Sequence, residues 1–253
     1  MTVSQQVAQA ITIEEFLAKV LPQSGIYMLF LTKKNKNFHK SYTNIDTMAS
    51  AVECFDNSGY SVYHACGSFQ TEKSRNAGNT AHFRSFFLDL DCGPQKADEG
   101  KGFINKVAAC NALVVFCKKI SLPQPTIIDS GGGFHVYWTL QDDIEADEWL
   151  SVATKLKQLT KFHKFTADDA RTADRASLLR PVGAKNLKYS PTRQVKALYV
   201  ADDVNFTVFK AKIETAESSS VSFGATSKIP AAKQVDQNLL GMAPQLETPK
   251  NIQ

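Results

Sequence analysis

The sequence predicts an α+β fold in which most strands pair as antiparallel hairpins. Segments with the apolar spacing of amphipathic helices interleave with segments whose apolar residues alternate or run on, as they do in strands. A run of three glycines joins two of these strand segments, which is typical of a hairpin. Helices that interleave with hairpin-like strand pairs favour an α+β sheet over a strictly parallel one. With 253 residues, of which 43% are apolar, the chain can bury a sizeable core.

The expected elements follow one another from residue 12 onward. Thr12 and Glu15 form a capping-box pattern, which predicts the start of a helix. The helix expected over residues 145–162 carries acids in its first turn and lysines near its end, as the helix dipole favours. Helices are expected over residues 12–21, 46–55, 104–120 and 145–162. Strands are expected over residues 25–32, 60–69, 83–93 and 194–200, with a strand pair over residues 125–140.

The domain organisation follows from composition. Residues 1–213 are expected to form the folded domain. Residues 214–253 hold one aromatic residue among many Ser, Ala, Pro and Gln, which predicts a disordered tail or a linker to a further domain. No apolar run reaches the length of a membrane span, and no basic start precedes an apolar block, so we expect a cytoplasmic protein without a membrane partner. A net charge of +4 is too mild to indicate a nucleic-acid partner by itself.

The first candidate site lies in the strand segment "SFFLDLDCG". Successive side chains of a strand point to opposite faces, so Asp89 and Asp91 share one face, about 6–7 Å apart along the strand. Leu88 and Leu90 then point into the core. Two carboxylates this close repel each other unless a cation or a proton intervenes. Oxygen ligands of this kind suit Mg²⁺ or Mn²⁺. The alternative is a strand end where two acids simply meet water.

The second candidate site is the glycine turn "DSGGGFH". Glycines allow close backbone approaches, so the amides near Ser130, Gly132 and Gly133 could form an anion-binding nest. His135 follows at the start of a strand, where its imidazole could donate to a phosphate oxygen. The alternative is a hairpin turn followed by a half-buried histidine. The chain has no G-x-x-x-x-G-K-[ST] pattern, which excludes a P-loop interpretation of these glycines.

The third candidate site is the segment "FTADDARTADRASLLRPVGAKNLK". Asp168 could complete a two-metal site as a third carboxylate, with Asp169 as the alternate. Arg180 and Lys185 are candidates for neutralising a triphosphate, arginine through its bidentate fork. The alternative is a solvated loop laced with salt bridges.

The three motifs, in this order, resemble the archaeo-eukaryotic primase superfamily, and specifically the primase-polymerase domains of phage and plasmid replication proteins. The resemblance is carried by "FFLDLD", "SGGGFH" and "DDARTADRASLLRPVGAKN", and it spans roughly residues 20–200. It implies an αβ unit packed on an RRM-like unit, with the active site between them. Asp168 is preferred over Asp169 because its distance from Asp174 fits the family pattern. Ala184 departs from the threonine that many relatives have after the glycine.

The resemblance also implies an activity, which is template-directed nucleotidyl transfer by a DNA primase or DNA polymerase. Asp89, Asp91 and Asp168 would hold two Mg²⁺ or Mn²⁺ ions. His135, Ser130, Gly132, Gly133, Arg180 and Lys185 would bind the incoming dNTP or NTP. Lys188 and Arg193 would contact the phosphates of a single-stranded DNA template. A helicase domain or another replication partner is implied as well.

Two rival functions stay open from sequence. One is a nucleic-acid or nucleotide-binding module that keeps this fold without catalysis, although the complete set of acids argues against it. The other is a metal-dependent nuclease built on the same carboxylates, which would leave the cations near Arg180 without a clear purpose.

Overall fold

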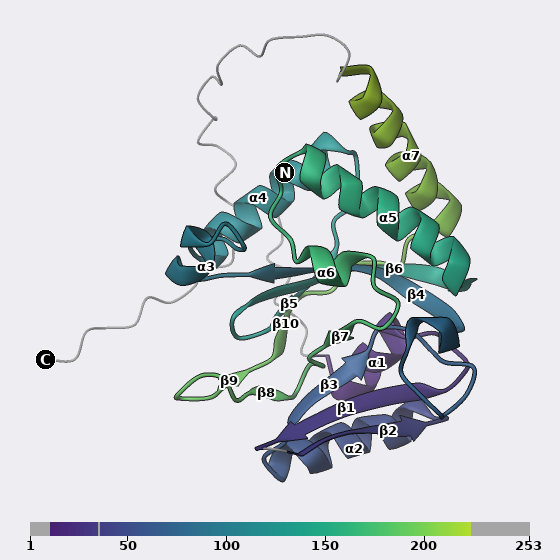
Figure 1. The fold of residues 1–253 in the computed structure, drawn as a ribbon, viewed down its shortest axis with the longest axis vertical. Coiled ribbons are helices and arrows are strands. Elements are labelled where there is room, and N and C mark those ends of the chain that lie inside the picture. The colour runs from purple at the N-terminus through teal and green to yellow at the C-terminus, as the bar shows by residue number, and fades with distance from the viewer. Residues whose placement is uncertain (1–10, 35, 224–253) are drawn as a thin grey trace, which may run out of the picture.

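The computed structural model describes residues 11–34 and 36–223 as a mixed α and β structure with antiparallel sheets, as the sequence predicts (Figure 1). The first sheet has the strand order β2-β1-β3-β7 and the second has the order β10-β5-β6-β4. The first contains β1 (Tyr27–Lys33), β2 (Lys36–Tyr42), β3 (Ser61–Ala65) and β7 (Leu178–Leu179). The second contains β4 (His82–Asp91), β5 (Thr126–Asp129), β6 (Gly133–Glu145) and β10 (Lys196–Tyr199). A separate hairpin pairs β8 (Lys185–Asn186) with β9 (Arg193–Gln194).

Two helices accompany the first sheet. Helix α1 (Ile13–Val20) begins with the predicted capping box, in which Thr12 and Glu15 each accept the other's backbone N–H. Helix α2 (Ile45–Asn57) packs on β1 and β3 (Figure 1). Because strand side chains alternate, Leu29 and Leu31 point to the face that is buried against these helices. The opposite face of this sheet carries the intervening side chains.

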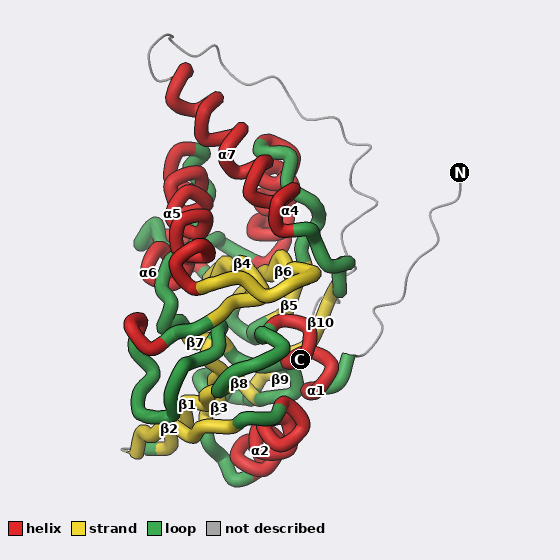
Figure 2. The backbone as a smooth tube through the Cα atoms, turned by 90° about the vertical axis from the view of Figure 1, so that its right-hand side faces the viewer, coloured by secondary structure: helices red, strands yellow, loops and turns green. Residues whose placement is uncertain are grey.

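Three helices cover one face of the second sheet (Figures 1 and 2): α4 (Lys106–Lys119), α5 (Ala146–Phe162) and α7 (Phe206–Phe223). Short helices are present at Pro94–Asp98 (α3) and Asp169–Thr172 (α6), with a 3₁₀ turn at Ala77–Asn79 (η1). Trp149 of α5 stacks on Phe83 of β4 at 4.0 Å, and its indole N–H donates to the Ser85 carbonyl over 2.9 Å. The aromatic packing fixes β4 against α5.

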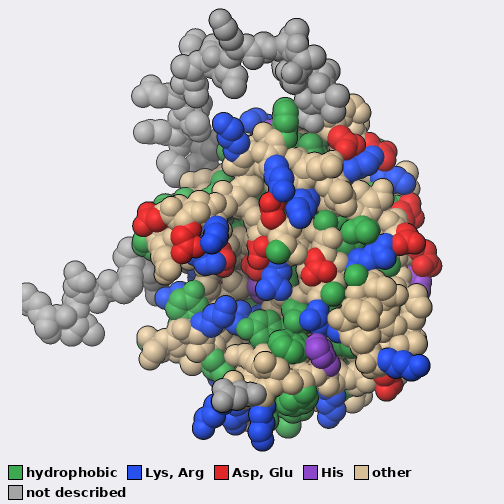
Figure 3. Space-filling model, viewed as in Figure 1, with side chains coloured by type: hydrophobic (Ala, Val, Ile, Leu, Met, Phe, Trp, Pro, Cys, Tyr) green, Lys and Arg blue, Asp and Glu red, His purple; other side chains and the backbone are tan. Residues whose placement is uncertain are grey.

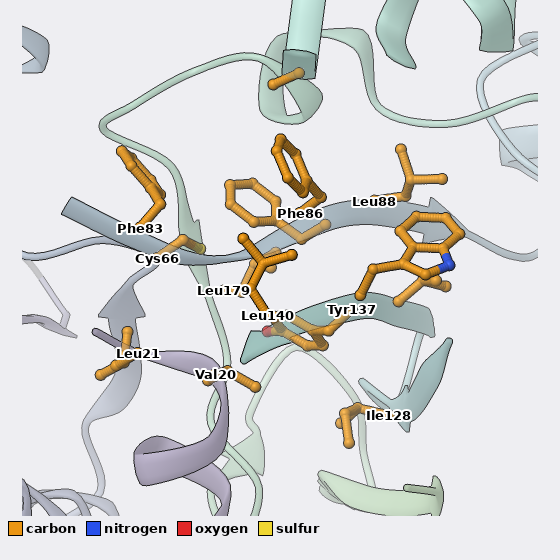
Figure 4. Packing of buried hydrophobic residues seen from close by; sticks show 14 of the residues in the cluster. Val20, Leu21, Cys66, Phe83, Phe86, Leu88, Ile128, Tyr137, Leu140 and Leu179 are labelled. Carbon is orange, nitrogen blue, oxygen red and sulfur yellow. The ribbon is translucent and has the colours of Figure 1, made fainter. Parts of the chain in front are cut away.

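The core fills both sides of the second sheet. In Figure 4, Phe86 and Leu88 point from β4 toward the helices, whereas Tyr137 and Leu179 lie on the other side. All four side chains are buried. Strand β4 therefore has packing on both faces along its middle, and its partly exposed polar side chains lie toward its two ends, His82 and Arg84 at one and Asp89 and Asp91 at the other.

Three features differ from the sequence prediction. Strand β2 was not expected, because five of its seven residues are exposed and it lacks a regular apolar alternation. Helix α7 was not expected either, and it corrects the predicted tail: residues 214–223 continue this helix, with Phe209 and Ile213 buried one turn apart. The rest of the predicted tail, residues 224–253, lies outside the described residues. None of the helices in the described part of the chain is long and apolar enough to cross a membrane.

Candidate active site

The two acids lie at the end of β4, and they share one face of the strand, as the alternation predicts. Leu88 and Leu90 are fully buried, while the side chains of Asp89 and Asp91 are 20% and 39% exposed. Strand β6 pairs with β4 so that Asp89 lies opposite His135 and Asp91 opposite Gly133. The first and second motifs therefore meet across a single strand pair.

Asp168 joins these acids from a distant part of the chain. Its backbone N–H donates to the Asp89 carbonyl over 2.9 Å, which fixes the start of α6 against the end of β4. Arg171 lies between the two carboxylates, with its Nε 3.5 Å from Asp168 Oδ2 and 3.9 Å from Asp89 Oδ2. Asp169, by contrast, forms an ion pair with Lys161 of α5 over 2.9 Å. The geometry favours Asp168 over Asp169 as the third acid.

Two cations hold the acids in this structure, and sequence reasoning assigned a role to neither. Arg171 bridges Asp89 and Asp168, and Lys96 of α3 places its Nζ 2.7 Å from Asp91 Oδ2. Arg171 follows Asp168 by three residues, a spacing at which helical side chains meet, so its pairing could have been predicted. Lys96 carries no such signal.

Asp89 has an unusual protonation equilibrium. Burial raises its pKa from 3.8 to about 7, and the negative charge of Asp91 adds to the effect. Arg171 opposes the shift, and Asp168 contributes to it. The site thus concentrates more negative charge than its own arginine and lysine neutralise, which is a setting that favours a bound cation.

The raised pKa of Asp89 predicts a pH-dependent stability. A carboxyl group whose pKa is higher in the folded state stabilises the fold below its unfolded pKa, and that contribution is lost as pH rises through about 7. Asp89→Asn keeps the group neutral at every pH. In a chelator, we expect the variant to be more stable than the wild type at pH 8 by on the order of 2 kcal/mol, with little difference near pH 4. Urea unfolding at both pH values measures this, and parallel profiles would contradict it.

A divalent cation fits the chemistry of these residues. Carboxylate oxygens are the ligands that Mg²⁺ and Mn²⁺ prefer, and Asp89 and Asp91 present them on one face of β4. Across residues 11–34 and 36–223, however, no three His, Cys, Asp or Glu side chains already stand close enough together to form a metal cluster. The carboxylate of Asp168 is turned to its own helix, because it accepts the Ala170 N–H over 2.9 Å. Binding of an ion by all three acids therefore requires their side chains to rotate inward.

His135 is buried beside Asp89, with its Nε2 3.9 Å from Asp89 Oδ1. Burial lowers its pKa to about 3, with further contributions from His64, Arg180 and Arg171. The ring is therefore neutral near pH 7. A neutral imidazole can donate one hydrogen bond to a phosphate oxygen without bringing a charge.

The ion pair between Lys106 and Asp129, which sequence reasoning missed, supports the glycine turn. The Gly131 N–H donates to Asp129 Oδ1 over 2.7 Å, and Lys106 Nζ lies 2.7 Å from both oxygens of Asp129. The Ser130 N–H donates to the Gly133 carbonyl over 3.1 Å. These two amides already have partners, so they do not form the open anion nest that the glycine run suggested. An Asp two residues before a glycine is a signal for this turn.

The hairpin β8–β9 packs on the other side of the glycine turn. Asn186 donates to the Ser130 carbonyl over 2.8 Å, and Arg193 donates to the Gly131 carbonyl over 2.7 Å. Arg193 also stacks on Tyr189 at 3.8 Å. A Cβ on Gly132 would collide with the Tyr189 hydroxyl. The glycines thus allow the turn to fit between β4 and this hairpin.

The cations of the third motif have different surroundings. Arg180 is buried; it donates to the Tyr63 hydroxyl over 2.5 Å, and its charge lowers the pKa of His135. Lys185 is engaged elsewhere, because its Nζ and its backbone N–H both bind the buried carboxylate of Asp56, at 3.0 and 2.7 Å. Lys188 is exposed. Of Arg180, Lys185 and Lys188, Arg180 is therefore the one whose charge acts on Asp89, as that of Arg171 does.

Comparisons with known proteins identify the fold. No family model and no curated protein sequence matches the chain. Among solved structures, it is similar to the archaeo-eukaryotic primase domain of the cyanophage S-2L primase-polymerase, with a TM-score of 0.53, 11% identity, and coverage of 76% of this chain and 89% of that one. It is also similar to the catalytic domain of the primase RepB′, solved in complex with initiator DNA, with a TM-score of 0.49, 12% identity, and coverage of 85% and 97%.

The chain has an α+β fold similar to that of the archaeo-eukaryotic primase domain of the cyanophage protein. This likeness bears out the fold that the resemblance of the three motifs implies. At 11% identity the likeness establishes the fold.

Proposed function

We propose that the chain is a template-directed nucleotidyltransferase, a primase-polymerase that joins nucleoside triphosphates on single-stranded DNA. The observation that supports this proposal is that Asp89 and Asp91, the backbone of Asp168, a neutral histidine and a buried arginine lie at one end of the β4–β6 pair. Asp168 is tied to Asp89 by its backbone, and Asp89 faces His135 across the ladder. Each group suits one part of a metal–nucleotide complex.

The acids would hold the metal ions. Two Mg²⁺ or Mn²⁺ ions at Asp89, Asp91 and Asp168 would lower the pKa of the attacking hydroxyl and stabilise the departing pyrophosphate. Lys96 and Arg171 pair with these carboxylates in the protein alone and would be released from them when cations bind. In the protein alone, the charges of Lys96 and Arg171 would offset most of the negative charge of the acids, and bound cations would take over this role.

The triphosphate would lie beside His135 and Arg180. His135 donates a hydrogen bond, and Arg180 supplies a desolvated positive charge. Ser130, Gly132 and Gly133 border this position and shape it through their packing. Lys185 would reach the outer phosphates only by exchanging Asp56 for them.

Lys188 and Arg193 are proposed contacts for template phosphates. Both are exposed and lie on or next to the β8–β9 hairpin, which packs on the glycine turn. Phosphate contacts of this kind position a strand without reading its sequence.

An incorporation assay tests the proposal. Labelled dNTPs and NTPs are supplied separately, with a single-stranded template, with and without a primer, in Mg²⁺ or Mn²⁺. We expect labelled product that depends on template and metal. Cleavage of labelled DNA without nucleotides would indicate a nuclease instead, and DNA binding with neither reaction would indicate a non-catalytic module.

A further inference from the structure

A row of aromatic rings crosses the first sheet on the face opposite helix α2. In the strand register, Phe30 of β1 lies between His39 of β2 and Tyr63 of β3. The Phe30 ring centroid is 4.8 Å from that of His39 and 6.2 Å from that of Tyr63. Directly opposed residues share a face, so the three rings form one continuous strip, called here the stacking row.

The rings of the stacking row are incompletely covered. His39 is exposed, and Phe30 and Tyr63 are half-buried, whereas Leu29 and Leu31 on the other face are fully buried. Farther along β1 on the same face, Met28 is buried in a small cluster with Phe69. The segment that carries Phe69 therefore covers one end of this face and leaves the row open beside it.

Cations lie over two of these rings. The Arg180 guanidinium is 4.5 Å from the centre of the Tyr63 ring, and that of Arg75 is 5.9 Å from the centre of Phe30. Arg75 Nε also donates to His39 Nε2 over 3.1 Å. Burial and the charge of Arg75 lower the pKa of His39, so its ring is neutral and suited to stacking.

The row runs from the edge strand β2 to the neighbourhood of the candidate active site. Lys34 lies in the β1–β2 turn, and Figure 3 shows Lys and Arg side chains gathered along the lower edge of the molecule. Lys33 and its opposed partner Lys36 belong to the other face of the sheet, where Lys33 Nζ lies 5.1 Å from the centre of the Tyr60 ring. At the active-site end of the row, the charge of Arg180 acts on both Asp89 and His135.

We propose that the stacking row binds the unpaired bases of a single-stranded nucleic acid and leads that strand to the acids of β4. Aromatic faces accept any base, and flanking cations track the phosphates, which is how proteins hold single strands without sequence preference. A duplex would not fit, because its bases are already stacked on one another. The role as a template path rests on the proposed function, whereas base stacking by the row is measurable without any catalysis.

Fluorescence anisotropy in a chelator, without nucleotides, tests the row directly. The probes are a labelled 20-mer of dT and an abasic 20-mer with the same phosphates. We expect the wild type to bind the dT strand more tightly. Phe30→Ala is expected to weaken dT binding about tenfold while leaving the abasic strand unaffected, since stacking on one aromatic ring contributes at about this level.

Phe38→Ala is the matched control, because Phe38 precedes His39 on the same strand and is exposed, but contacts Phe55 and Tyr60 on the opposite face. It should leave both affinities unchanged. His39→Ala, at an exposed position, repeats the test if Phe30→Ala lowers the melting temperature. Equal losses on dT and abasic strands, or unchanged dT binding in both row variants, would overturn the row as a base platform. A row variant that raised the KM for nucleotide but left strand affinity unchanged would overturn it as well.

The outcomes separate the two proposals. Asp89→Asn should retain the full preference for dT over the abasic strand, because the acid lies outside the row. Base-dependent binding without nucleotide incorporation would support the row and count against the polymerase activity. If the protein incorporated nucleotides but the row variants did not change strand affinity, the polymerase activity would be supported and the role of the row would be contradicted.

Discussion

Asp89→Asn is expected to reduce template-directed nucleotide incorporation by roughly a thousandfold, because a lost metal contribution of several kcal/mol acts on the transition state at 1.36 kcal/mol per tenfold in rate. Asparagine preserves the shape of the side chain and removes its negative charge. The fold should persist, since the neutral form of this group is already favoured by its burial. Single-turnover incorporation at saturating Mg²⁺ or Mn²⁺, with circular dichroism on the same preparation, measures the effect.

The neighbouring acids of α6 provide the matched comparison. Asp168→Asn should lose incorporation to a similar extent, because its backbone bond to Asp89 places it at the site. Asp169→Asn should retain it, because that carboxylate pairs with Lys161 on α5. Equal activity in the Asp89 and Asp169 variants would count against the metal-binding role. If Asp169→Asn lost incorporation and Asp168→Asn kept it, Asp169 would be the third acid.

The part of the site that could be predicted from sequence is the part carried by local periodicity. His135 reaches Asp89 through the pairing of β4 with β6, two strands that are far apart in the sequence. Alternation along a single strand, by contrast, places Asp89 and Asp91 on one face and depends only on neighbouring residues. The same holds for α1, whose capping box is complete within four residues.

The ion pairs of Asp129 and Asp56 could not be predicted, because their partners are far apart in sequence. Lys106 and Asp129 are separated by 23 positions, and Asp56 and Lys185 by 129. No local pattern distinguishes a lysine that meets a buried carboxylate from one that meets water or a phosphate. The assignment of Lys185 to a nucleotide therefore used its charge without knowledge of its partner.

The glycine run illustrates a third situation, in which packing explains glycines that the sequence assigned to nucleotide binding. Three glycines suggest amides free to bind an anion, but the Gly131 amide is used by Asp129 and the turn is packed between two strand pairs. What the positions require is the absence of a side chain. A glycine can be required because a side chain would clash or because its amide binds a ligand, and the sequence looks the same in both cases. The packing around the glycine distinguishes the two.

That distinction makes Gly133→Ala the second variant with a large expected effect. Gly133 pairs with Asp91, and a Cβ at this position would overlap the Leu90 carbonyl oxygen, which is backbone and cannot move aside. Overpacking at such a point costs about 1–3 kcal/mol. The end of β4 should separate from β6, so incorporation should fall together with the free energy of unfolding.

Gly78→Ala is the control, because the nearest atom to its added Cβ is the Asn76 side-chain oxygen, at an ordinary contact distance of 3.6 Å. It should change neither activity nor stability appreciably. Urea unfolding and incorporation kinetics on both variants decide the point. If Gly133→Ala were as stable as the wild type but could not bind nucleotide, the glycine would serve the triphosphate directly, and the anion-nest interpretation of the run would be right after all. If it lost stability and activity together while Gly78→Ala kept both, the glycine is there to let β4 and β6 close on each other and hold the acid pair in place.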